Sequence, residues 1–392
     1  MKFLTASRLW NGVGFVENPV IGIEDGRIHS ISTVMAGQLP NQSSDENLDF
    51  PGATLAPAFF DVHIHGSAGH DVMEATSEAL SAIGQFLASH GTGSYLATTV
   101  TAPLDETLRA LEGLAKLIDN PQAIESASVG RPTSVPIGIH LEGPFLSHVR
   151  RGVHPEKLLL EPDTHVFDQL YDASGGHVRL MTIAPELNGA TELTAHATAR
   201  GVRVSMGHSN ANGAETHAAI AAGAVSATHT FNAMRPLHHR DAGILDTVLT
   251  TDSLYSELIC DGVHTTPGIV KLWWRAKGPA RAILVTDAIS AAGMPDGEYS
   301  LGGIKVTVAN GIALAGGVLS GSLLSLDRAL ENLIRFTGAP LDQAFRLVAV
   351  NPAAMTGFSN SVGSVSVGRA AHLVAMDGAG KLIAAIHNGR LV

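Results

Sequence analysis

The regular alternation of strand-like and helical segments through the middle of this 392-residue chain is the feature that most constrains its fold. Eight apolar, β-like runs end near His65, Thr99, Glu142, Ala184, His208, Thr230, Cys260 and Asp287. Helical patterns separate them, for example over residues 77–90, 104–119, 211–222 and 267–277. Strands that alternate with helices in this way predict an α/β fold, a (β/α)₈ barrel of the TIM type. A doubly wound open sheet is the alternative, and the eight regular units favour closure.

The two ends of the chain differ from the middle and resemble each other. Residues 20–28 read as a strand, an Asp-Gly turn and a second strand, and residues 372–386 have a similar pattern. Neither end is long enough to bury a core alone. We therefore expect one small β-sandwich domain built from both termini, residues 1–56 and 357–392, around a barrel that spans residues 57–356.

The segment after the eighth run combines β character with a helix start. Residues 301–317 are Gly-rich and β-like, and Ser322 is the expected N-cap of a helix over residues 323–337.

Composition limits the partners and the compartment. The 45% of hydrophobic residues allows a sizeable core, and the net charge of −11 argues against nucleic acid or an anionic membrane as a partner. The single cysteine, Cys260, cannot form a disulfide within the chain, which fits a reducing compartment. Charge interrupts the first residues before an apolar stretch develops, so we expect no signal peptide and a cytoplasmic protein.

Two histidines one residue apart, His63 and His65, close the first barrel strand. Side chains alternate between the faces of a strand, so both imidazoles point to the same side. Later strands end in the same kind of residue, with Glu142 on the third, His208 on the fifth, His229 on the sixth and Asp287 on the eighth. Because a barrel places its active site at the carboxyl ends of its strands, these side chains are expected to converge.

The chemistry that suits this set is metal-assisted hydrolysis. Imidazole and carboxylate are ligands of Zn²⁺, our first choice, and Fe²⁺, Mn²⁺ and Co²⁺ accept them too. One or two ions per subunit are expected, since Glu142 is placed to bridge a pair. A bound metal lowers the pKa of water from about 15.7 to about 7 and polarises a carbonyl. Asp287 is then the free carboxylate that accepts a proton and passes it to the leaving group.

Other polar residues are given structural interpretations. His140 shares the side of Glu142 but lies one pleat deeper, so we interpret it as structural, and Cys260 as a buried small hydrophobe rather than a nucleophile. Asp61 is either a support for the site or a loop charge. His90, His165, His177, His196 and His217 fall in helical or loop stretches and are expected at the surface.

The motifs around the site are found in residues 57–66, 140–145, 206–209, 228–234, 261–264 and 284–288. They resemble, in order, those of the N-acetylglucosamine-6-phosphate deacetylases, a family within the amidohydrolase superfamily. The His-x-His and the aspartate indicate the superfamily. Leu-Glu-Gly-Pro-Phe at 141–145 and His-Thr-Phe-Asn-Ala-Met at 229–234 are typical of the deacetylases.

The resemblance implies a metal-dependent hydrolase that converts N-acetylglucosamine 6-phosphate to glucosamine 6-phosphate and acetate, in amino-sugar catabolism or cell-wall recycling. It implies that Glu142, His208 and His229 hold the main metal and that His63 and His65, with Glu142, hold a second. Family members that replace one histidine of the pair use a single ion, whereas this sequence keeps both.

Substrate contacts also follow from the resemblance. His154 matches a histidine near the carbonyl or hydroxyls, and Asn232 and Ala233 would meet the phosphate through the backbone. His264 and Arg240 match phosphate and sugar contacts, with Arg240 reaching into the neighbouring subunit's site of a homodimer.

A cationic cluster after the sixth strand supports a phosphorylated substrate. Arg235, His238, His239 and Arg240 lie together there in an otherwise acidic chain, and the planar guanidinium suits phosphate. An ordinary solvated loop is the alternative. The sequence departs from the superfamily pattern at His372, where members often have an acid. It also departs at the pocket rim, where Arg150 precedes a second arginine and where His238 and His239 are paired.

Three rival functions stay open. The nearest rival is an N-acetylgalactosamine-6-phosphate deacetylase of the same fold, which an assay on both 6-phosphate epimers would separate. Cyclic-amide hydrolases of the superfamily typically use a modified lysine as the bridging ligand, and Glu142 at that place counts against them. A catalytically inactive scaffold is the rival from another class, but such proteins usually lose ligands and this chain keeps all of them.

Overall fold

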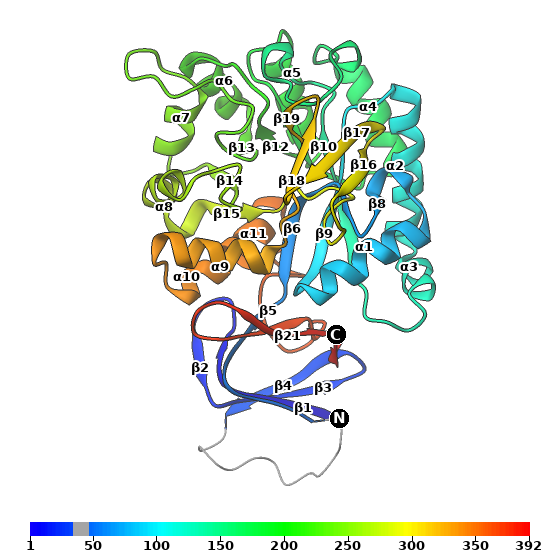
Figure 1. Ribbon diagram of the computed structural model, residues 1–392, viewed down its shortest axis with the longest axis vertical. Helices are drawn as coiled ribbons and strands as arrows, with labels where there is room; N and C mark the ends of the chain where they lie inside the picture. The colour runs from blue at the N-terminus through cyan, green and yellow to red at the C-terminus, as the bar shows by residue number, and fades with distance from the viewer. Residues whose placement is uncertain (34–46) are drawn as a thin grey trace.

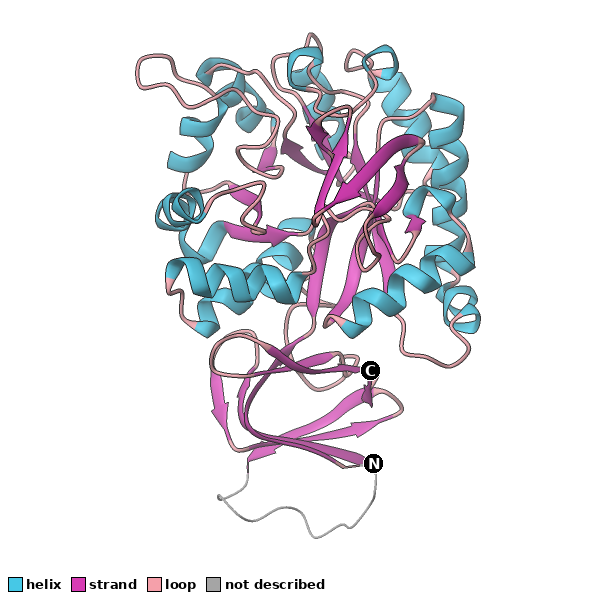
Figure 2. Ribbon diagram, viewed as in Figure 1, coloured by secondary structure: helices cyan, strands magenta, loops and turns pink. Residues whose placement is uncertain are grey.

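A computed structural model describes residues 1–33 and 47–392 of the chain. It contains a barrel of parallel strands surrounded by helices, and a smaller β domain that lies below the barrel in Figure 1 and consists of strands in Figure 2. The predicted fold class is confirmed. Within the described residues, none of the helices combines the length and the apolar character that a membrane crossing requires.

Eight strands form the barrel sheet, and each is parallel to its neighbours. In chain order they are β6 (Phe59–Ile64), β9 (Thr92–Thr99), β10 (Val135–Glu142), β11 (Val178–Ile183), β12 (Arg203–Met206), β13 (Ala224–Ala227), β14 (Tyr255–Ile259) and β15 (Ala282–Val285). Each ends within a few residues of its predicted end, so the strand-like runs located the barrel correctly.

The barrel closes at the end of β6 and just beyond the end of β15. The backbone N–H of Asp287 donates to His63 O over 2.9 Å, and that of His65 donates to Ala288 O over 2.8 Å. The fully buried Asp61 accepts from Thr286 Oγ1 over 2.6 Å across the same seam. Burial raises the pKa of Asp61 to about 6 against the opposing effect of these hydrogen bonds. Asp61 therefore supports the barrel closure and is no loop charge.

Helices cover the outside of the barrel (Figures 1 and 2). They are α1 (Ser77–Ser89), α2 (Leu104–Asp119), α3 (Pro121–Ala127), α4 (Thr164–Ala173), α5 (Ala190–Ala199), α6 (Gly213–Ala222), α7 (Ile244–Thr250), α8 (Pro267–Arg281), α9 (Leu326–Thr337), α10 (Leu341–Phe345) and α11 (Asn351–Thr356). The four helical patterns singled out in the sequence correspond to α1, α2, α6 and α8. Their apolar faces pack on the outer faces of the strands in two buried clusters.

The predicted start of α9 is wrong by three residues. The helix begins at Leu326 and Ser325 occupies the N-cap position, whereas Ser322 was expected there. The Ser322 hydroxyl instead donates to Thr286 O over 2.6 Å and accepts from the backbone N–H of Leu324. A tertiary hydrogen bond at the barrel seam thus uses the side chain that local capping rules had assigned to the helix.

Both termini lie in the small domain (Figure 1). Its strands form one sheet around its own buried core and are β1 (Lys2–Trp10), β2 (Phe15–Glu17), β3 (Pro19–Glu24), β4 (Arg27–Thr33), β5 (Leu48–Pro57), β20 (Leu373–Met376), β21 (Leu382–His387) and β22 (Arg390–Leu391). The C-terminal β20 pairs antiparallel with the N-terminal β5, which joins the two ends of the chain as predicted. We propose to divide the domains at the ends of β5 and α11.

The position of the small domain fixes which end of the barrel is accessible. Only Ala58 separates β5 from β6, so the amino ends of the barrel strands face the small domain and the carboxyl ends point away from it (Figure 1).

Two small sheets follow barrel strands in the chain, one after β6 and one after β15. They are β7 (Gly66–Ser67) with β8 (His70–Asp71), and β16 (Gly297–Leu301), β17 (Ile304–Ala309), β18 (Ile312–Ala315) and β19 (Val318–Leu319). The second of these confirms the β character predicted for residues 301–317.

Two stacked histidines in the small domain predict loss of stability in acid. The rings of His372 and His387 lie 4.0 Å apart, and burial lowers their pKa values to about 4 and about 3. His372 Nδ1 accepts from the backbone N–H of Asn388 over 3.2 Å, which a protonated ring cannot do. Because these pKa values are depressed in the folded state, the stability is complete above the unfolded value of 6.5 and is lost as pH falls toward 4.

We expect the free energy of unfolding to fall by roughly 3 kcal/mol per such histidine between pH 7 and pH 4. Thermal unfolding followed against pH should show a shallower acid limb for His372→Gln than for the wild type. His217→Gln changes an exposed histidine on α6 and should leave the curve unchanged. Parallel acid limbs for the wild type and His372→Gln would contradict the expectation.

Candidate metal centre

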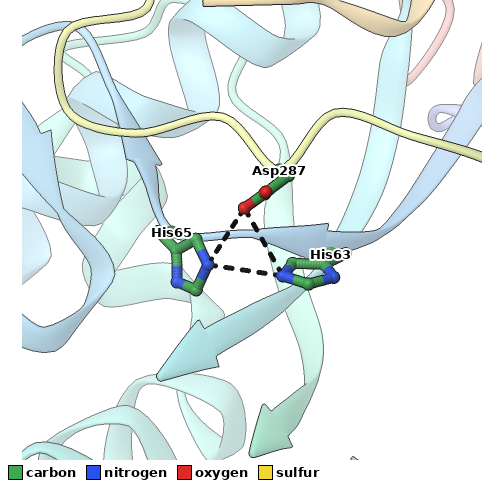
Figure 3. Close-up of side chains that lie close together, drawn as sticks. All are labelled: His63, His65 and Asp287. Atoms are coloured by element: carbon green, nitrogen blue, oxygen red, sulfur yellow. Dashed lines mark hydrogen bonds and ion pairs between the residues drawn. The ribbon is translucent and has the colours of Figure 1, made fainter. Parts of the chain in front are cut away.

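Three of the predicted side chains meet at the seam of the barrel. His63 and His65 extend from the end of β6, and Asp287 points toward both from the segment after β15 (Figure 3). The two Nε2 atoms lie 3.3 Å apart, and Asp287 Oδ1 lies 3.5 Å from that of His63 and 3.2 Å from that of His65. All three residues are buried, and their ligand atoms lie within 4.8 Å of one another.

A second group of three lies beside the first. Glu142 Oε1 is 3.1 Å from His229 Nε2 and 3.3 Å from His208 Nε2, and the two imidazole nitrogens are 3.1 Å apart. These ligand atoms also lie within 4.8 Å of one another. Glu142 joins the two groups, because its Oε2 lies 3.1 Å from His65 Nε2 and its Oε1 lies 3.3 Å from His63 Nε2. The structure therefore brings together all six residues that the sequence analysis selected.

The donor set fits a divalent cation. A neutral imidazole carries one N–H. In this centre the Nε2 atom of His63 faces that of His65, and the Nε2 atom of His208 faces that of His229. Each of these nitrogens therefore faces another imidazole nitrogen and not a separate hydrogen-bond donor. Several lone pairs directed at one point, from nitrogen and carboxylate oxygen, are the arrangement that metal ions such as Zn²⁺ and Fe²⁺ require.

The electrostatics of the centre call for positive charge. Burial disfavours a charged His65, but its hydrogen bonds with Asp287 and Glu142 and their charges raise its pKa to about 9. The charges of Glu142 and Asp287 likewise raise the pKa of His63 well above its usual value. Burial also opposes ionisation of the two carboxyl groups, yet the charge of His63 and the histidine hydrogen bonds hold both of their pKa values below the usual range. A divalent ion supplies the same positive charge and leaves the imidazoles neutral.

Backbone strain marks the same positions. His208, His229 and Asp287 have φ values of 46°, 28° and 50°, in the left-handed region that residues other than glycine rarely adopt. Each lies two residues beyond the end of a barrel strand, at a point where the chain turns sharply. Strain of this kind is retained where the direction of a side chain matters for function.

Hydrogen bonds behind the centre orient two of the rings. The Nδ1 atom of His65 lies 3.0 Å from Thr98 O, and that of His208 lies 3.1 Å from Arg150 O. A carbonyl oxygen accepts only from a protonated Nδ1, so both histidines present an Nε2 lone pair to the centre.

The centre opens into a cavity of about 280 Å³. Among the residues that line it are four of the predicted substrate contacts, His154, Asn232, Ala233 and His264. His154 Nε2 lies 3.6 Å from Glu142 Oε2, and its Nδ1 pairs with Thr101 Oγ1 over 2.8 Å. His264 is held by Asp261 Oδ2 over 2.6 Å. The fifth predicted contact, Arg240, is exposed and does not line the cavity of its own subunit.

Comparison with known proteins agrees with this geometry. Residues 54–392 match the model of the amidohydrolase family. The chain belongs to the amidohydrolase family.

The relatives of this amidohydrolase include phosphosugar deacetylases. It is 35% identical to the N-acetylglucosamine-6-phosphate deacetylase of Bacillus subtilis, over 96% of this chain and 93% of that protein. It is 36% identical to the N-acetylgalactosamine-6-phosphate deacetylase of Escherichia coli O157:H7, over 95% and 94% of the two chains. A Mycobacterium smegmatis N-acetyl-D-glucosamine-6-phosphate deacetylase with one aspartate changed to alanine, in complex with N-acetyl-D-glucosamine-6-phosphate, superposes with a TM-score of 0.89. The two are 32% identical, and the match covers 100% of this chain and 98% of that one.

The structural interpretations of other polar residues in the amidohydrolase hold. His140 is buried and pairs with Thr182 Oγ1 over 2.8 Å, away from the cavity lining. Cys260 is fully buried, and burial raises the pKa of its thiol to about 12. The five histidines expected at the surface are half-buried or exposed.

One residue of the site, Glu257, was not singled out from the sequence, and the parts played by Arg150 and by the β16–β19 sheet were underestimated. Glu257 lies fully buried on β14, 3.7 Å from His63 Nδ1. The signal for it was a glutamate in the middle of a buried strand, directly before the apolar residues Leu258 and Ile259. Arg150, noted only as a rim residue, lines the cavity, as do Leu301, Val318 and Leu319 of the β16–β19 sheet.

Proposed function

We propose that this amidohydrolase removes the acetyl group of N-acetyl-D-glucosamine 6-phosphate and yields D-glucosamine 6-phosphate and acetate. The observation that carries the proposal is the cavity itself, in which a carboxylate beside a buried histidine–glutamate centre shares one space with groups suited to a phosphate. Relatives at 35% and 36% identity over nearly the whole chain act on this class of substrate, as their names state.

The metal ligands we propose are Glu142, His208 and His229 for one ion, and His63 and His65 with Glu142 for a second. Bound there, a divalent metal, with Zn²⁺ our first choice, supplies a lower pKa for water and polarises the amide carbonyl. The residues of the chain then have to move one proton and hold the substrate in place.

We assign the proton transfer to Asp287. Its lowered pKa keeps the carboxylate ionised at neutral pH, so it can accept the proton of the attacking water. The same proton then passes to the sugar nitrogen, because an amine leaves poorly unless it is protonated. We assign the acetyl carbonyl or a sugar hydroxyl to His154, and the support is its position in the cavity lining near Glu142.

At the other end of the substrate, we propose that Arg150, His264 and the backbone at Asn232 and Ala233 bind the phosphate. Arg150 is the support for this within one subunit. It is the one arginine or lysine among the residues that line the described cavity. Its Nε donates to Asn210 Oδ1 over 3.1 Å, and no carboxylate of the described residues forms an ion pair with it. A guanidinium with free N–H groups suits a phosphate.

Arg150→Gln should raise KM for N-acetylglucosamine 6-phosphate about 10- to 100-fold and change kcat only slightly, since a hydrogen bond to a charged group is worth about 1.5–3 kcal/mol. Initial rates on the phosphorylated and the unphosphorylated sugar are to be compared. Arg109→Gln, which changes an exposed arginine on α2, is the matched control. Equal losses on both sugars would mean that the Arg150 side chain acts only through its hydrogen bond with Asn210 and does not bind the phosphate.

We further propose a cytoplasmic homodimer in which Arg240 contributes to the neighbouring subunit's cavity. The support is the exposure of Arg240 and its separation from the cavity of its own subunit, together with a single, buried cysteine. Arg240→Gln is expected to raise KM for the phosphorylated sugar as Arg150→Gln does.

The function is tested by measuring acetate release from N-acetylglucosamine 6-phosphate with and without a chelator. We expect activity that the chelator abolishes and that added divalent metal restores. N-Acetylgalactosamine 6-phosphate is the second candidate substrate, favoured by the relative from Escherichia coli. Faster turnover of that epimer would replace our proposal, and no release from either would reject both.

A further inference from the structure

Glu257 is a buried carboxylate that the proposed reaction does not use. It lies on β14 with no exposed surface, and Ser226 Oγ donates weakly to its Oε1 over 3.4 Å. Its Oε2 atom has no hydrogen-bond partner among the described residues. A carboxylate in the interior of a barrel is costly unless something pairs with it, so this one requires an explanation.

A second atom with the same deficit faces it. His63 Nδ1 is also buried and also lacks a hydrogen bond in the described part of the chain. It lies 3.7 Å from Glu257 Oε2, slightly beyond hydrogen-bond length. Glu257 Oε2 is an acceptor and His63 Nδ1 can carry a proton. The two atoms form a hydrogen bond once they move closer by less than about 1 Å.

The neighbouring groups do not offer His63 another partner. Its ring meets the His140 ring edge-on at 4.7 Å, but His140 Nε2 is engaged with Thr182 and its Nδ1 faces Thr98 Oγ1. The rings of His65 and His208, by contrast, each have a backbone carbonyl at Nδ1. Of the rings of His63, His65 and His208, only that of His63 has a carboxylate facing its Nδ1 atom.

We propose that Glu257 is a positioning residue for His63. Its carboxylate accepts the Nδ1–H, fixes the tautomer whose Nε2 lone pair faces the centre, and so strengthens binding of the ion held by His63 and His65. The inference rests on the proposed function, because it takes those histidines as metal ligands. A carboxylate behind a ligating histidine raises the basicity of the ring, and its loss typically weakens metal binding 10- to 100-fold.

The test compares Glu257→Met with Glu257→Gln. Methionine has a similar length and no acceptor, whereas glutamine keeps an acceptor oxygen but has no charge. Zn²⁺ is titrated calorimetrically into each metal-free protein, and bound metal is counted by elemental analysis. We expect two ions in the wild type, and in Glu257→Met one ion bound as in the wild type and the other 10- to 100-fold more weakly. Glu257→Gln should be intermediate.

A stability measurement separates this role from a merely structural one. In the metal-free protein Glu257→Met removes a buried, poorly paired carboxylate, so its Tm should equal or exceed that of the wild type. A lower Tm, unchanged affinity for both ions, loss of both ions together, or a single ion in the wild type would each overturn the proposal. Acetate release by the wild type tests the function separately, because the metal titration needs no substrate.

Discussion

Asp287→Asn is expected to lower kcat for acetate release by about 10³-fold, within the usual range for a general acid–base group. Asparagine keeps the size of the side chain and its place between His63 and His65, but it cannot accept the proton of water. The rate is measured at saturating N-acetylglucosamine 6-phosphate, together with the metal content of the variant. We expect that content to match the wild type.

Two outcomes distinguish the possible roles of this aspartate. A slow variant with its full metal content supports proton transfer, whereas a slow variant that has lost an ion identifies Asp287 as a ligand of the His63–His65 site. Near-normal turnover would remove Asp287 from the mechanism. Asp377→Asn, in a loop of the small domain, is a control for the same change of residue far from the cavity.

Glu142→Gln is expected to remove both bound metal and activity, with a loss of rate of at least about 10³-fold. The two carboxylate oxygens of Glu142 lie within 3.1–3.3 Å of the Nε2 atoms of four histidines. An amide takes one negative charge away from the centre and turns an N–H₂ group toward some of those nitrogens. Elemental analysis of the purified variant, with and without added Zn²⁺, measures the loss.

Glu112→Gln is the matched control for that experiment, because Glu112 is an exposed glutamate on α2 and does not line the cavity. Its metal content and rate should equal those of the wild type. If Glu142→Gln keeps both ions, the proposed bridging position of Glu142 is wrong, whatever the effect on rate.

The barrel was predictable because each of its strands is a short apolar run and helical periodicity fills the gaps. The small domain was predictable for a related reason: two β-rich ends, each too short to bury a core, had to pair with each other, as β5 and β20 do. The start of α9 was not predictable, because Ser322 and Ser325 are both acceptable N-caps by local rules. The tertiary bond from Ser322 to Thr286 decides between them.

The centre was predictable where its residues follow strand ends, since parallel strands bring those ends to one rim. Glu257 follows a different rule. It sits in the middle of β14, and its importance depends on which neighbour faces it, His63 from a strand nearly two hundred residues earlier. Arg150 was ambiguous beside Arg151, and only the structure shows that Arg151 has Glu156 as a partner while Arg150 lines the cavity. The role of Arg240 depends on a second subunit, which the sequence of one chain does not contain.

The seam between β6 and β15 has a consequence for biosynthesis. His63 and His65 emerge early from the ribosome, but the residue that hydrogen-bonds to the backbone of His63 is residue 287. The residue that hydrogen-bonds to the Asp61 side chain lies 225 positions after it in the chain. In a nascent chain the barrel therefore stays open beside His63 and His65 until its last strand has docked. A chain that stops before β15 contains all five proposed metal ligands but lacks Asp287, which faces His63 and His65, and the hydrogen bonds that close the barrel beside them.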